Sequence, residues 1–132
     1  MKSIYIKKTP YSYSADKIYD DSNSQLEILA DWFTDDVGDD SKHWTAWFNN
    51  DEYVETDSNA TWLEKRGSDI IFGSIAESMV IKNYEIPGKH TVTLSKQNVL
   101  ELLAVWEQIL KTHTNEIMII EENGVFRMFE VQ

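Results

Sequence analysis

The sequence contains no cysteine, only two prolines and five glycines, and few basic residues. The lack of cysteine excludes a disulfide framework, a thiolate metal site and a cysteine nucleophile. The glycines form no phosphate-binding loop, and the nucleophile elbow of serine hydrolases is also absent. The sequence therefore gives no indication of an enzyme, and we expect no cofactor.

Long hydrophobic runs are missing as well. Even the run from Ile117 to Ile120 is far shorter than the roughly 20 apolar residues that span a bilayer. Residues 3–14 are mostly polar and lack the apolar region of a signal peptide. We therefore expect a cytoplasmic protein that does not contact a membrane.

The composition is that of a folded chain. Hydrophobic residues make up 42% of the 132 residues and aromatic residues 12%, which excludes wholesale disorder. This length predicts a single domain, residues 1–132, and neither a repeat nor a linker interrupts it.

The negative charge is concentrated in one part of the sequence. Thirteen acidic residues and only two lysines lie between residues 16 and 57, so this segment carries the whole net charge of −11. Such a charge repels phosphate, which disfavours direct binding of nucleic acid or of an anionic membrane. The asymmetry indicates an interaction surface for a basic partner.

Large aromatic residues are interleaved with these acids. Four of the five tryptophans lie there or at its edge: Trp32, Trp44, Trp47 and Trp62. Aromatic anchors among carboxylates are typical of a protein–protein hot spot, although aromatics facing the core would give the same pattern. From this segment we predict a partner-binding surface made of Asp31, Asp35, Asp36, Asp39, Asp40, Trp44, Trp47, Asp51, Glu52, Tyr53, Glu55 and Asp57.

A metal site is not indicated. The three histidines, His43, His90 and His113, lie more than 20 residues apart. The acids from Asp35 to Asp40 come in adjacent pairs and lack the alternate spacing of an EF-hand loop.

The apolar pattern predicts an α+β fold with a mainly antiparallel sheet. Residues 25–37 fit both a helix and a strand; Ser24 as a cap and Gly38 as a stop favour the helix. Trp44, Trp47 and Phe48 suggest a helical turn. We expect strands over residues 2–8, 69–75, 79–86, 90–94, 116–121 and 125–131, with 69–75 and 79–86 forming a hairpin.

The clearest helix spans residues 96–111. Ser95 is its predicted cap, and its apolar stripe consists of Val99, Leu102, Leu103, Trp106 and Leu110. We expect this stripe to pack on the sheet.

Asn123-Gly124 predicts a tight hairpin turn between the last two strands. The turn pairs Glu122 with Val125, which places Met118 opposite Phe129 on one face and Ile119 opposite Met128 on the other. Both faces are then apolar. Either residues 25–62 or a partner must cover the second face, and we favour residues 25–62.

The C-terminal third resembles a known group of proteins. Leu94-Ser95-Lys96 opens an amphipathic helix that carries Trp106-Glu107 near its end, and Asn115-Glu116-Ile117-Met118-Ile119-Ile120 precedes a turn and a closing strand. Over residues 94–132 this arrangement is similar to the small acidic immunity proteins of bacterial toxin–immunity systems, including contact-dependent growth inhibition. The resemblance implies non-covalent neutralisation of one cognate toxin, without catalysis or cofactor.

Our leading hypothesis is an immunity-type protein that binds a basic toxin domain, such as a nuclease, as a monomer or weak homodimer. One alternative is a nucleic-acid mimic that occupies the site of a host nucleic-acid-binding protein. The other is a homodimer whose acids serve only solubility. Under the leading hypothesis, Trp47→Ala weakens partner binding more than folding.

Overall fold

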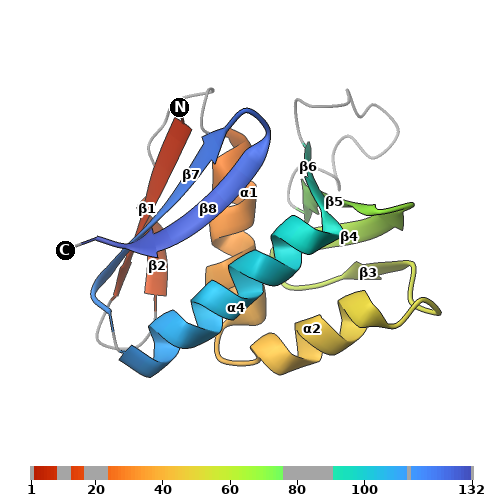
Figure 1. The fold of residues 1–132 in the computed structure, drawn as a ribbon, viewed down its shortest axis with the longest axis horizontal. Coiled ribbons are helices and arrows are strands. Elements are labelled where there is room, and N and C mark those ends of the chain that lie inside the picture. Colours follow the sequence, from red (N-terminus) through yellow and green to blue (C-terminus); the bar gives the residue numbers. More distant parts are fainter. Residues whose placement is uncertain (1, 9–12, 17–23, 76–90, 113, 132) are drawn as a thin grey trace.

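The computed structural model describes residues 2–8, 13–16, 24–75, 91–112 and 114–131 (Figure 1). Two antiparallel four-stranded sheets lie on either side of helix α1, and helix α4 crosses in front of them. The predicted α+β class, the antiparallel pairing and the packed helix are confirmed. The described elements are β1 (Lys2–Lys8), β2 (Tyr13–Asp16), α1 (Ser24–Asp31), η2 (Trp32–Val37), α2 (Ser41–Asn49), β3 (Glu55–Asp57), β4 (Thr61–Arg66), β5 (Asp69–Ser74), β6 (Thr91–Ser95), α4 (Lys96–Thr112), β7 (Glu116–Glu122) and β8 (Val125–Glu130).

The first sheet has the strand order β2-β1-β7-β8. Its β7–β8 hairpin has the predicted register, with Glu122 opposite Val125 and Met118 opposite Phe129. Asn123 and Gly124 have φ values of 54° and 80°, as a type I′ turn requires. On its inner face Ile4, Ile6, Ile117 and Ile119 are fully buried against the core.

The prediction that residues 25–62 cover the outer face of this sheet is wrong. The outer row contains Tyr5, Met118 and Phe129, and Phe129 keeps 38% of its surface exposed. Helix α1 instead contacts β1 and β7 on the buried side and continues to β5 and β6 of the second sheet. Residues 25–62 therefore join the two sheets and leave this row partly open.

The second sheet has the strand order β3-β4-β5-β6. Strands β3 and β4 were not predicted, because no element was assigned to residues 50–68 from the sequence. Strand β5 lies between β4 and β6 and so has both of its edges occupied. Residues 79–86, its predicted hairpin partner, lie outside the described residues.

The predicted helix over residues 25–37 is confirmed, and its second half is a π-helix. The Gly38 N–H donates to Phe33 O at 2.9 Å, five residues back, and Gly38 has a φ of 51°. Leu26, Leu29 and Phe33 of the apolar stripe are buried. Ser24, the predicted cap, is instead the first residue of α1.

An aromatic cluster joins these helices to the second sheet. The Trp32 ring makes edge-to-face contacts with the rings of Phe33, Trp44, Phe48 and Phe72, at centroid distances of 4.7, 5.4, 5.9 and 4.9 Å. Trp32 is fully buried, and its Nε1 finds no hydrogen-bond acceptor among the residues that the structure describes. Edge-to-face aromatic pairs stabilise a fold beyond the effect of the apolar area that they bury.

Helix α4 begins as predicted, since Ser95 Oγ accepts a hydrogen bond from the Asn98 N–H at 3.1 Å. Its buried stripe includes Trp106, which donates from Nε1 to Gly38 O at 2.7 Å. Ile109 is buried in this stripe, whereas Leu110 lies at its margin. Trp106 thus ties α4 to the turn that follows η2.

Asn98 satisfies backbone groups of the edge strand β8. Its Nδ2 donates to Phe126 O at 2.8 Å, and its Oδ1 accepts from the Phe126 N–H at 3.0 Å. The Asn98 side chain therefore replaces one residue of a neighbouring strand. Near the other end of β8, Thr112 Oγ1 donates to Glu130 Oε1 at 2.7 Å.

Candidate functional site

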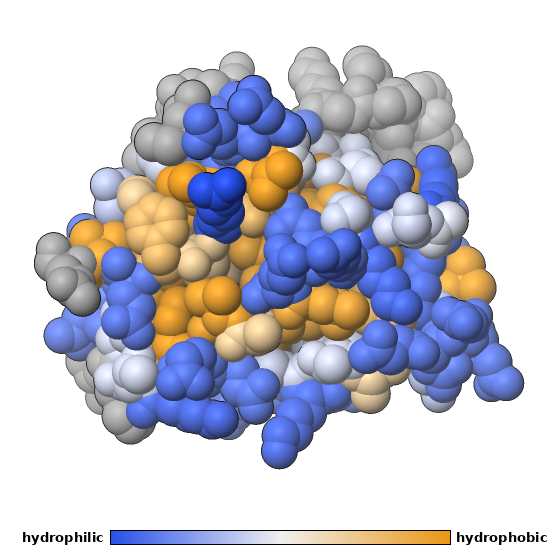
Figure 2. Space-filling model, in the orientation of Figure 1, coloured by the Kyte–Doolittle hydropathy of each residue, from blue (hydrophilic) through white to orange (hydrophobic). Residues whose placement is uncertain are grey.

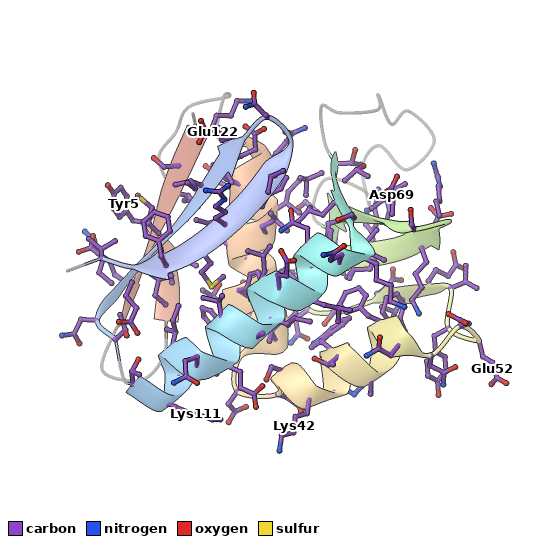
Figure 3. The ribbon with its side chains drawn as sticks, in the orientation of Figure 1. Tyr5, Lys42, Glu52, Asp69, Lys111 and Glu122 are labelled. Carbon is purple, nitrogen blue, oxygen red and sulfur yellow. The ribbon has the colours of Figure 1, made fainter. Side chains whose placement is uncertain are left out.

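Most of the predicted carboxylates lie on the surface. Residues 24–75 contain twelve acidic residues and three basic ones. In Figure 3, Glu52 projects at the far end of α2 and Lys42 lies below the same helix, while Glu122 lies on the opposite side of the view. We call the exposed set the acidic surface: Asp35, Asp39, Asp40, Asp51, Glu52, Glu55 and Asp57.

Helix α2 separates two pairs of these acids. Asp39 and Asp40 precede its N-terminus, and Asp51 and Glu52 follow its C-terminus, about 13 Å away at 1.5 Å per residue. Carboxylates are favourable near a helix N-terminus and unfavourable near a C-terminus. The second pair therefore needs a compensating positive charge.

Lys65 of β4 supplies that charge. Its Nζ donates to Trp47 O at 2.6 Å and to Asn50 O at 2.8 Å, at the C-terminal end of α2. The same Nζ lies 4.3 Å from the centroid of the Trp47 ring. Burial lowers the Lys65 pKa and Lys96 lowers it further, while Asp51 acts in the opposite direction.

We expect Lys65→Met to lower the free energy of unfolding by about 1–2 kcal/mol, because the C-terminal carbonyls of α2 lose a charged donor. Urea denaturation followed by circular dichroism measures the loss. Lys42→Met is the matched control, since Lys42 is exposed on the same helix. Equal midpoints for Lys65→Met and the wild type would contradict the capping role.

Asp36 links η2 to the turn between β3 and β4. The Asp36 carboxylate accepts a hydrogen bond from the Ala60 N–H at 2.9 Å. It also accepts from Thr61, whose backbone N–H lies at 3.1 Å and whose hydroxyl Oγ1 lies at 2.5 Å. Asn59 Nδ2 also donates to Asp35 O at 3.3 Å. These bonds bring the β3–β4 turn and the start of β4 beside the end of η2. Asp36 and Asp31 are only partly exposed, so they are not counted in the acidic surface.

The placement of Trp44 and Trp47 as surface anchors is wrong. They are only 5% and 8% exposed, because with Phe48 they form the buried stripe of the amphipathic helix α2. Trp44 Nε1 also donates to Asp36 O at 3.3 Å. Trp47→Ala is therefore expected to act on folding first. Tyr53 remains 51% exposed beside the acidic surface.

Trp62, which the sequence left unassigned, is the tryptophan that reaches the surface. It lies on the outer face of the second sheet, opposite Gly73 of β5, and is partly exposed. A Cβ on Gly73 would come within 2.2 Å of Trp62 Cε2, so the indole lies directly against the glycine backbone. The alternation of Trp62 and Glu64 with the buried Thr61 and Leu63 is the sequence signal for this face.

Acidic side chains border the Trp62 indole. Asp57 pairs directly with Trp62 across the strands, and Glu55 pairs with Glu64. Lys65 N donates to Val54 O and Ser58 N to Thr61 O, so these two pairs fall at the non-hydrogen-bonded positions, where side chains are closest. Like charges directly opposite each other are unfavourable. Arg66 Nη2 lies 3.0 Å from Glu64 Oε2 and partly offsets this charge.

Other site types receive no support from the described residues. No group of three or more histidine, aspartate and glutamate residues within them is placed to hold a metal ion. None of the helices in the described ranges is long and apolar enough to cross a membrane.

Comparison with known proteins gave no match: no family model, no curated protein and no solved structure is similar to the chain.

Proposed function

We propose that this protein binds and neutralises a basic toxin domain through its acidic surface, as an immunity protein does. The observation that carries the proposal is the exposure of seven carboxylates on η2, the η2–α2 turn, the α2–β3 loop and strand β3. Among the described residues the same region contributes a partly exposed tryptophan, Trp62. Acids around an aromatic ring suit a cationic protein surface.

The charge has two physical consequences for such a complex. A concentrated field accelerates the encounter with a basic partner, and this effect falls as salt screens the charges. The partly exposed apolar area then contributes to slow dissociation. A nuclease domain is a fitting partner because its substrate groove must be positive, and carboxylates can occupy the positions of phosphates.

The experiment is capture of the partner from the native host, followed by co-expression of the captured basic domain with and without this protein in a test bacterium. We expect the basic domain alone to stop growth and the co-expressed protein to restore it. Capture of a housekeeping nucleic-acid-binding protein would favour the nucleic-acid mimic instead.

A charge variant tests the surface itself. Asp39→Asn, Asp40→Asn and Glu52→Gln together are expected to slow association with the captured domain about tenfold at low salt. Glu101→Gln, Glu107→Gln and Glu122→Gln make the matched control, since they remove the same charge from α4 and the β7–β8 hairpin. Surface plasmon resonance measures both rates. An equal loss in the two variants would leave total charge, and not this surface, as the cause.

A further inference from the structure

The outer face of the second sheet combines an aromatic ring with unbalanced carboxylates. Trp62 lies near the middle of this face, with Asp57 directly opposite on β3 and Glu64 two residues further along β4. Glu55 lies opposite Glu64 and is exposed. Asp57 is exposed as well. These four side chains form what we call the Trp62 platform: Glu55, Asp57, Trp62 and Glu64.

Gly73 shapes the platform. Because no side chain stands between them, the indole is seated directly on the strand backbone at Gly73. A tryptophan held in this way loses little conformational entropy when a ligand stacks on it. Glycine in a strand interior is otherwise unfavourable, and the ring compensates for its missing side chain.

Among the described residues, acidic side chains outnumber basic ones on this face of the sheet. Glu55 and Glu64 face each other at a non-hydrogen-bonded pair, and Glu64 forms an ion pair with Arg66 on its own strand. A cation between Glu55, Asp57 and the indole would relieve the repulsion and gain a cation–π contact.

The edge of the sheet leaves this approach open. Strand β3 pairs with β4 alone in the described part of the chain, whereas Asn98 covers the β8 edge of the first sheet. A ligand side chain can therefore approach Asp57 and Glu55 both from the outer face of the sheet and from its β3 edge.

We propose that the Trp62 platform receives an arginine side chain of the basic partner, with the guanidinium stacked on the indole and hydrogen-bonded to Asp57. Arginine fits better than lysine because its planar guanidinium stacks on aromatic rings and binds carboxylates through two N–H groups. This inference rests on the proposed function, since the arginine belongs to that partner. It adds a specific anchor to a surface otherwise defined by charge.

The test compares two peptides of equal charge, hexa-arginine and hexalysine, at low salt. Titration is followed by the NMR signal of the Trp62 indole N–H. We expect both peptides to bind the acidic surface, hexa-arginine about three- to fivefold more tightly, and the indole signal to move with hexa-arginine. Trp62→Leu is expected to remove the difference between the peptides.

Two variants serve as controls. Trp62→Phe keeps an aromatic face and should keep most of the preference for hexa-arginine. Gly73→Ala keeps every charge and the tryptophan itself but displaces the indole ring from the strand, so the preference should fall. Circular dichroism confirms that each variant is folded, and the indole signal of the wild type provides a test that needs no variant.

The outcomes separate this inference from the proposed function. An unmoved indole signal at saturating hexa-arginine, or a preference that survives Trp62→Leu, would overturn the platform while leaving the acidic surface intact. Failure of both peptides to bind at low salt would overturn the platform and the proposed function together.

Discussion

Replacement of Trp106 by alanine is expected to lower the free energy of unfolding by about 3–5 kcal/mol, the range for truncating a large buried aromatic residue. Trp106 is 1% exposed and contacts Phe33 at a ring-centroid distance of 5.3 Å. Its Nε1 donates to Gly38 O. The variant therefore also removes this hydrogen bond to the turn that leads to α2. Core packing and the position of the acidic surface are thereby linked.

Urea denaturation measures this loss, with Gln108→Ala as the control because Gln108 is exposed on the same helix. The control should remain within about 0.5 kcal/mol of the wild type. Similar stabilities of Trp106→Ala and Gln108→Ala would show that α4 does not pack by this face.

Replacement of Asn98 by alanine is expected to cost about 2–4 kcal/mol, because the N–H and C=O of Phe126 both lose their partner in a buried environment. Asn98 is only 8% exposed. Without the Asn98 side chain, the edge of β8 is also left uncovered at Phe126. Native-state hydrogen exchange should show faster exchange at the Phe126 amide.

Asn115→Ala is the matched control, since Asn115 is an exposed asparagine before β7. It should change neither the unfolding midpoint nor the exchange of Phe126. Unchanged exchange of the Phe126 amide in Asn98→Ala would contradict the role of Asn98 as a strand surrogate.

Local signals predicted much of the fold. Ser95 capped α4 as expected, and Asn123-Gly124 fixed the register of the β7–β8 hairpin, because both features act within a few residues. The second sheet was missed at β3 and β4. Its pairing depends on the turn at Asn59 and Ala60, which Asp36 holds from 24 residues away. A contact at that sequence distance leaves no local pattern.

For the candidate site, the prediction that the acidic residues lie on the surface mostly held, and the prediction that Trp44 and Trp47 lie there was wrong. The acids lie where hydrophilic patterning put them, mostly on the surface. Figure 2 shows hydrophilic residues gathered over the part of this view around α2, with apolar residues nearer the centre. Trp44 and Trp47 follow helical spacing and are buried. Trp62 follows strand spacing, and the alternation along β4 places it on the outer face, opposite Gly73.

The central claim is that the acidic surface is where the basic partner binds, and mapping the contact by NMR tests it most directly. With the captured basic domain added to isotope-labelled protein, we predict that the amide signals of residues 35–40 and 51–57 and the Trp62 indole signal change most. Changes confined to the outer face of the first sheet, around Tyr5, Met118 and Phe129, would contradict the claim.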